Sequence, residues 1–346
     1  MKRLLAFAAG AAVLLAGTEA FACGAAFGPS IAIDSRQDII LVWKDNVETY
    51  VFQPVFCGTS TDFGLIMPVP ATLSQKPSLT DKQAFTTAAA LSAPTKKRVD
   101  QHHGLACGGG SVGGSKSTTV DTTTVVASGQ VGILDWVEIK ADTEESFTDW
   151  LTANGYPYST ASASVFSYYV EKGWYFLAFR ISQEAAPDGG TICRALGPVA
   201  LYFPAAAPVV PSRMAGAGNS SGPGFSWRIF GITHGDAQLA FSDGPNSNRV
   251  LMYSGAINAG DVPSFSGLAA TGDRLTRLTL SFYPGLSDPD VGLTLAAAAD
   301  YRGTEDVYVY DDSICSVSRR GRSPHSFLLT LSGLALLGLV CWRRWR

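Results

Sequence analysis

Two apolar segments, one at each end of the chain, constrain the fold most, because they separate the part that can fold as a globular unit from the parts that cannot. Residues 1–22 combine a basic start, a short apolar stretch and the small-x-small pattern of Ala20 to Ala22, as in a cleavable signal peptide. Residues 326–342 are uncharged and precede three arginines, which predicts a short transmembrane helix and a cytoplasmic basic tail at 343–346. The sequence therefore predicts an exported chain with a single-pass C-terminal membrane anchor.

Each end leaves an alternative open. Cleavage after residue 22 would make Cys23 the first residue, where a lipid could be attached, although Ala20 and Phe21 fit ordinary cleavage better. At the other end, Cys315, a polar basic linker at 312–325, the helix and the arginines resemble the C-terminal sorting signals of myxobacterial surface proteins. That resemblance implies processing by a membrane protease and display on the cell surface, whereas a plain tail anchor is the alternative.

Composition agrees with export and argues against one class of partner. The whole chain has a formal net charge of −3, and the two end segments hold five basic residues but one acidic residue, so the region between them carries about −7. Such a surface repels nucleic acid. With 36 glycines and 18 prolines, the chain also resembles a β-rich secreted protein.

Four cysteines are candidates for disulfides in an oxidising compartment: Cys23, Cys57, Cys107 and Cys193. Cys315 is set aside for the sorting signal. Three pairings of the four are possible. We favour Cys23–Cys57 with Cys107–Cys193, because the first would join the mature start to the first hairpin.

The hydrophobic pattern predicts an α+β fold: a β-rich secreted ectodomain with a central helical pair, plus one C-terminal transmembrane helix. Its N-terminal part, 23–95, contains a hairpin around Lys44-Asp45-Asn46, a third strand at 63–67 and a helix at 82–91. A Gly/Ser/Thr-rich loop or linker follows at 96–124.

An α+β core is predicted at 125–215. Its first helix has capping-box spacing at Asp142 and Glu145 and a stop at Asn154-Gly155. A second helix is expected at 162–172. Strands are expected at 125–127, 133–139, 174–181, 199–203, 226–232, 249–253, 275–282 and 307–310. The last four lie in a C-terminal β-rich region, 216–311, which could form a separate small unit.

Several motifs then occur in order along residues 23–215. They are Cys23-Gly24, the hairpin, Gly64-Leu65-Ile66-Met67-Pro68-Val69-Pro70, Leu91-Ser92-Ala93-Pro94, Trp150-Leu151, Asn154-Gly155-Tyr156, Tyr169-Val170-Glu171-Lys172-Gly173-Trp174 and Gly197-Pro198-Val199. In this order they resemble the bacterial exported family called domain of unknown function 2330. The resemblance implies no established activity or site.

Weak catalytic candidates lie in the Gly-rich loop. Cys107 with His102 or His103 could supply a nucleophile and a base, or ligands for a soft metal. A solvated loop with a disulfide-bonded Cys107 is the simpler interpretation. His234 follows a predicted strand, where a surface turn explains it more simply than a catalytic base.

Weak metal candidates are oxygen-bearing side chains at turns. Asp243, Asn246 and Asn248 surround Gly244-Pro245, and Asp288 with Asp290 repeats the pattern less fully. Calcium prefers six to eight oxygens, which neither set supplies, so turn chemistry explains both.

The aromatic run contains Tyr168, Tyr169, Trp174, Tyr175 and Phe176. It could form a sugar-stacking platform, and core packing is its simpler interpretation.

The sequence thus predicts a surface-anchored envelope protein with a non-catalytic binding or structural role, without a cofactor. The expected partners are the membrane, through the C-terminal helix, and an envelope protein or polysaccharide. The alternative is an envelope hydrolase or transpeptidase that uses the loop cysteine and a histidine. A metal-dependent ectodomain is the third possibility.

Overall fold

The computed structural model describes nine stretches of the chain: residues 25–27, 36–59, 63–100, 122–156, 158–182, 191–218, 224–244, 248–282 and 289–309. Two units divide the chain, one formed by 1–95 and 109–303, the other by 96–108 and 304–346. The predicted signal peptide, Cys315 and the predicted transmembrane helix lie outside the described stretches. Within those stretches, no helix has the length and apolar character needed to cross a bilayer.

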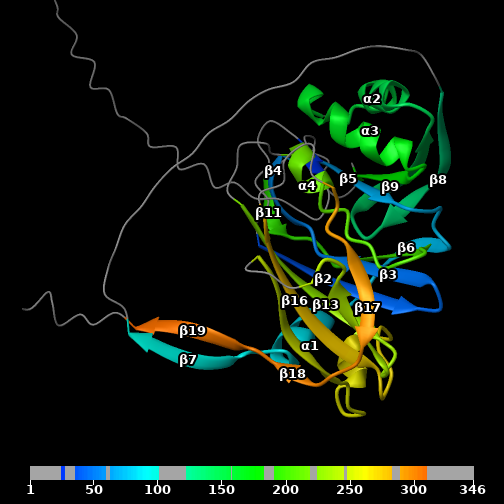
Figure 1. The fold of residues 1–346 in the computed structure, drawn as a ribbon. Coiled ribbons are helices and arrows are strands. Elements are labelled where there is room, and N and C mark those ends of the chain that lie inside the picture. The colour runs from blue at the N-terminus through cyan, green and yellow to red at the C-terminus, as the bar shows by residue number, and fades with distance from the viewer. Residues whose placement is uncertain are drawn as a thin grey trace, which may run out of the picture. The chain divides into compact units, whose positions relative to one another are not determined.

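An eight-stranded sheet in the first unit has the order β18-β15-β16-β13-β2-β3-β12-β6 (Figure 1). Its strands are β2 (Arg36–Lys44), β3 (Val47–Phe52), β6 (Gln75–Leu79), β12 (Val199–Pro204), β13 (Phe225–Thr233), β15 (Arg249–Ala256), β16 (Arg274–Phe282) and β18 (Tyr301–Arg302). The predicted hairpin is confirmed, since β2 pairs with β3 through a turn whose Asp45 and Asn46 have φ values of 52° and 58°.

β13, β15 and β16 lie in the same sheet as the N-terminal hairpin, so these strands do not form the separate small unit considered for 216–311. β13 pairs with β2 in parallel, and β16 and β15 continue the same sheet beyond β13. The N-terminal hairpin therefore lies inside a sheet that the region 216–311 completes. β2 has both faces covered, which explains its nearly continuous apolar sequence.

A five-stranded sheet has the order β1-β5-β10-β9-β8. Its strands are β1 (Ala25–Phe27), β5 (Gly64–Val69), β8 (Thr123–Val131), β9 (Leu134–Ala141) and β10 (Tyr175–Ile181). The predicted helical pair is confirmed as α2 (Glu144–Ala153) and α3 (Ala163–Glu171), which contact each other. Gly155 and Gly173 end the two helices with φ values of 72° and 69°.

Three clusters of buried apolar side chains lie between these elements. One joins the helical pair to the five-stranded sheet through Phe147, Phe166 and Phe176. The second lies between the two sheets, and the third lies between the eight-stranded sheet and α1 (Gln83–Leu91). Alternate residues of β2 serve the last two clusters, because Ile39 belongs to one and Ile40 to the other.

The end of α1 explains one sequence motif. The carbonyl oxygens of Leu91 and Ala93 accept hydrogen bonds from the guanidinium of Arg302, and that of Ser92 accepts one from Arg277 at 3.4 Å. Two arginines from the C-terminal strands thus satisfy carbonyls that the helix leaves unpaired.

Two further expectations needed correction. The N-terminal cap of α2 is Thr143, not Asp142, and its capping box uses Ser146. Residues 96–100, predicted as the start of a loop, form β7 (Thr95–Asp100), which pairs with β19 (Thr304–Val309). The remaining elements are β4 (Val55–Thr59), β11 (Thr191–Ala195), β14 (Ala237–Phe241), β17 (Leu293–Ala297), α4 (Met214–Gly218) and the 3-10 helices η2 (Thr160–Ser162) and η3 (Val262–Phe265).

Candidate functional site

A group of charged and aromatic side chains surrounds Asp290, and we call it the Asp290 cluster. Its members are Tyr168, Tyr169, Lys172, Arg213 and Asp290. Three segments far apart in the sequence supply them: the end of α3, the turn before α4 and the segment before β17.

The helix geometry of α3 sets the first half of the cluster. Tyr168 and Lys172 are one turn apart, so Lys172 Nζ reaches the Tyr168 hydroxyl at 2.6 Å. Tyr169 is fully buried on the neighbouring side of the helix. Gly173 then adopts a left-handed conformation, and β10 begins at the residue after Trp174.

The buried side of the cluster is a hydrogen-bond network. The Tyr169 hydroxyl donates to Asp290 Oδ1 at 2.6 Å and accepts the Met214 backbone N–H at 3.1 Å. The same Oδ1 accepts the Arg213 backbone N–H at 3.0 Å, and the Asp290 N–H donates to the Tyr168 hydroxyl at 3.3 Å. This network fastens the segment before β17 to α3 and α4.

Burial sets the protonation chemistry of the network. Loss of solvation raises the pKa of the Asp290 carboxyl above its usual range, against the opposing effects of its hydrogen bonds from Tyr169 and Arg213 and of the Lys172 charge. Burial, followed by the nearby Asp290 charge, raises the pKa of Tyr169 well above its usual range. Tyr169 therefore stays protonated and acts as a donor.

The outer side of the cluster is cationic and aromatic. Lys172 Nζ lies 4.2 Å from the ring centre of Tyr168, 5.2 Å from that of Trp174 and 3.7 Å from Asp290 Oδ2. The Arg213 guanidinium lies 4.2 Å from the Tyr168 ring centre. Because the Lys172 side chain is 40% exposed and the two rings are half-buried, this side can meet a ligand.

The arrangement can bind but supplies little for catalysis. Two cations beside half-buried rings suit an anionic or sugar-like ligand. Asp290 Oδ1 accepts hydrogen bonds from the Tyr169 hydroxyl and the Arg213 N–H, which gives this oxygen a positioning role, while Oδ2 lies 3.7 Å from Lys172 Nζ.

The weak catalytic candidates Cys107, His102 and His103 lie outside the described residues, and their role stays a prediction. His234 is described. Its Nδ1 lies 4.0 Å from Asp273 Oδ1, and its side chain is 59% exposed. Asp273 Oδ2 already accepts Lys44 Nζ at 2.6 Å and the Ala270 N–H at 2.6 Å. This environment fits a surface turn.

The weak metal candidates are not assembled into a site by the described residues. Asp243 Oδ2 forms an ion pair with Arg249 Nη1 at 2.5 Å, which lowers the pKa of Asp243. Asn248 is also described, whereas Asn246 and Asp288 lie outside the described residues. The described stretches contain no group of three or more His, Cys, Asp or Glu side chains that could hold a metal ion.

The residues of the proposed aromatic platform differ in burial. Tyr169 and Phe176 are fully buried in the helix-facing core, while Tyr168, Trp174 and Tyr175 are half-buried. Core packing therefore explains Phe176 and the ring of Tyr169, whose hydroxyl belongs to the Asp290 cluster. Tyr168 and Trp174 lie on the outer side of that cluster, whereas Tyr175 lies beside Lys140.

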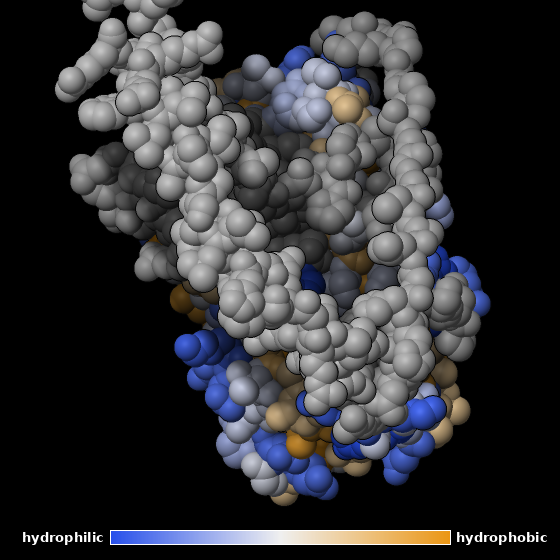
Figure 2. Space-filling model, turned by 90° about the vertical axis from the view of Figure 1, so that its left-hand side faces the viewer, coloured by the Kyte–Doolittle hydropathy of each residue, from blue (hydrophilic) through white to orange (hydrophobic). Residues whose placement is uncertain are grey.

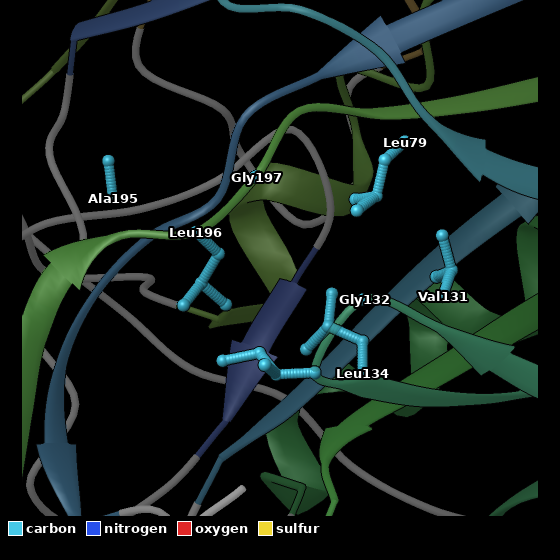
Figure 3. Close-up of a pocket in the computed structure, with 8 residues that line it drawn as sticks. Leu79, Val131, Gly132, Leu134, Ala195, Leu196 and Gly197 are labelled. Atoms are coloured by element: carbon cyan, nitrogen blue, oxygen red, sulfur yellow. The ribbon is translucent and has the colours of Figure 1, made fainter.

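A small apolar pocket lies where the β8–β9 turn meets the end of β6 and the segment that joins β11 to β12 (Figure 3). Leu79, Val131, Leu134 and Leu196 line it, and its volume is about 240 Å³. It is smaller than a typical ligand pocket of roughly 300–1,000 Å³.

On the face shown in Figure 2, hydrophilic and hydrophobic residues lie interspersed wherever the atoms are not grey.

Sequence reasoning missed the Asp290 cluster as a unit. The spacing of Tyr168 and Lys172 on a predicted helix was a usable signal. Arg213 gave none, and Asp290 was noted only as a possible turn ligand beside Asp288.

Comparison with known proteins supplies the family. Residues 17–294 match a family described as an uncharacterised protein conserved in bacteria, DUF2330, and the chain belongs to this family. A search of curated proteins found no match. Among solved structures, the crystal structure of baculovirus P35 is similar at 7% identity, over 78% of this chain and 96% of that one, with a TM-score of 0.32.

Proposed function

We propose that this family member is an exported, membrane- or surface-anchored envelope protein that binds an anionic polysaccharide without catalysis. Export and anchoring rest on the sequence of residues 1–22 and 326–342. The binding role rests on the outer side of the Asp290 cluster.

One observation carries the binding role: Lys172 and Arg213 both lie against the Tyr168 ring, with Trp174 beside Lys172. Sugar rings stack on aromatic side chains, and carboxylate, sulfate or phosphate groups accept hydrogen bonds from Lys and Arg. The local cations stand out on an ectodomain whose net charge is about −7, so they would direct an anionic chain to this place.

Binding of purified protein to alginate, an anionic polysaccharide, and to dextran, a neutral one, tests the proposal by calorimetry at low salt. We expect alginate to bind and Lys172→Gln to weaken it by about tenfold, because one exposed charge-assisted contact is worth about 1.4 kcal/mol. Lys76→Gln is the matched control, since Lys76 is an exposed lysine on β6. Equal weakening by both variants, or no binding to alginate, would overturn the proposal.

Export is tested separately with the native protein. An N-terminal peptide that begins at Cys23 supports cleavage of the signal, and an intact Met1 peptide contradicts it.

A further inference from the structure

Cys57 and Cys193 are directly opposite one another in the structure. β4 and β11 form a two-stranded antiparallel sheet, and the register pairs Cys57 with Cys193 at its centre. The strands come from regions far apart in the sequence, so no local pattern could have indicated this contact.

The register is supported at one end of the ribbon by described contacts. The Leu196 N–H donates to the Pro54 carbonyl oxygen at 2.7 Å, and Gln53 Nε2 donates to the Leu196 carbonyl oxygen at 3.1 Å. All five residue pairs from Thr191–Thr59 to Ala195–Val55 follow without a bulge.

Antiparallel register places the two cysteines within disulfide range. Directly opposite residues have Cα atoms about 4.5 or 5.5 Å apart, depending on whether the pair is hydrogen-bonded. Disulfides span Cα separations of about 4.4–6.8 Å, so either kind of pair satisfies the requirement. A two-stranded ribbon is also marginal by itself and gains from a covalent link.

We propose that Cys57 and Cys193 form a disulfide that joins β4 to β11. This pairing differs from the one favoured from the sequence and leaves Cys23 and Cys107, both outside the described residues, as the second possible pair. The bond rests on the proposed export, because the cytoplasm keeps thiols reduced.

The chemistry is thiol–disulfide exchange with a disulfide oxidant of the exporting compartment. One cysteine thiolate attacks the oxidant and forms a mixed disulfide, and the second cysteine then displaces the oxidant's sulfur. The two cysteines lose two electrons and two protons, and the oxidant is reduced to two thiols. Oxidised glutathione can play this part in vitro.

Peptide mass spectrometry without reduction tests the bond, because trypsin places these four cysteines of the full-length chain on four peptides: 4–36, 45–82, 99–116 and 181–194. Purified full-length chain equilibrated with oxidised and reduced glutathione should yield peptide 45–82 linked to 181–194, and reduction should abolish the linked species. Cys107→Ser should keep this link. Cys57→Ser should abolish it and leave Cys193 open to alkylation.

Linkage of Cys57 to Cys23 or Cys107, or free Cys57 and Cys193 in the oxidising buffer, would overturn the proposal. The in vitro experiment does not depend on export. A link formed in vitro but absent from the native protein would therefore contradict the proposed location and leave the pairing intact.

Discussion

The hydroxyl of Tyr169 offers the sharpest test of the Asp290 cluster. Tyr169→Phe removes one oxygen atom that donates to Asp290 Oδ1 and accepts the Met214 N–H. The ring itself can stay, since it packs against Trp174 and Phe176 without using the hydroxyl.

The expected cost follows from two lost contacts in a buried place. A hydrogen bond to a charged group is worth about 1.5–3 kcal/mol, and leaving the buried Met214 N–H without an acceptor costs about 1–3 kcal/mol. The two overlap, because one oxygen atom makes both contacts. We therefore expect Tyr169→Phe to lower the free energy of unfolding by about 2–4 kcal/mol.

Tyr156→Phe is the matched control. Tyr156 is also buried, at 4% exposure, but its hydroxyl makes no hydrogen bond within the described stretches. Because removing it breaks no hydrogen bond, Tyr156→Phe should not lower the free energy of unfolding. Urea unfolding followed by tryptophan fluorescence measures both variants. If the free energies of unfolding of the two variants differ by less than about 0.5 kcal/mol, the hydrogen bonds of Tyr169 do not stabilise the fold and the reasoning is refuted.

Three further predictions concern other parts of the fold. Burial raises the pKa of Glu48 well above its usual value of 4.5, so the native state holds the proton more tightly. Stability should therefore fall by up to about 1.4 kcal/mol per pH unit as pH rises from 4.5 towards the native pKa, and Glu48→Gln should remove this slope in urea unfolding at several pH values. Gly231→Ala should cost about 1–3 kcal/mol in the same assay, because the new methyl group would lie 2.7 Å from Leu239 Cβ, whereas Gly260→Ala, with open space around it, should cost little. Arg302→Ala should cost about 1 kcal/mol by removing the hydrogen bonds at the end of α1, and an unchanged thermal midpoint would contradict that role.

The sequence predicted the long elements because their patterns are strong. β2 and β3 have buried apolar runs on either side of a turn, and the Asp and Asn in this turn are residue types that tolerate positive φ values. α2 and α3 are each followed by a glycine with a positive φ value. The strands it missed are short or lie at sheet edges. β6, for example, reads Gln-Lys-Pro-Ser-Leu and is mostly exposed, so only its pairing with β12 makes it a strand.

The candidate site was predictable only in its local half. Helical spacing brings Tyr168 and Lys172 together, and that spacing is visible in the sequence. Asp290 lies 121 residues after Tyr169 in the sequence. The pairing of β14 with β17 and the hydrogen bond from the Val291 N–H to Ser212 Oγ hold its segment beside Tyr169. Long-range pairing of this kind leaves no periodic signal.

The strand order explains why the family match runs without a break across a chain whose motifs fade after residue 215. β13 lies beside β2, so the apolar edge of the N-terminal hairpin is covered only when residues 225–233 are present. The two arginines that hold the end of α1 also come from beyond residue 270. Residues 23–215 alone would leave β2 without its neighbour β13, and the family match to residues 17–294 includes β13, β15 and β16, which extend the sheet on that side.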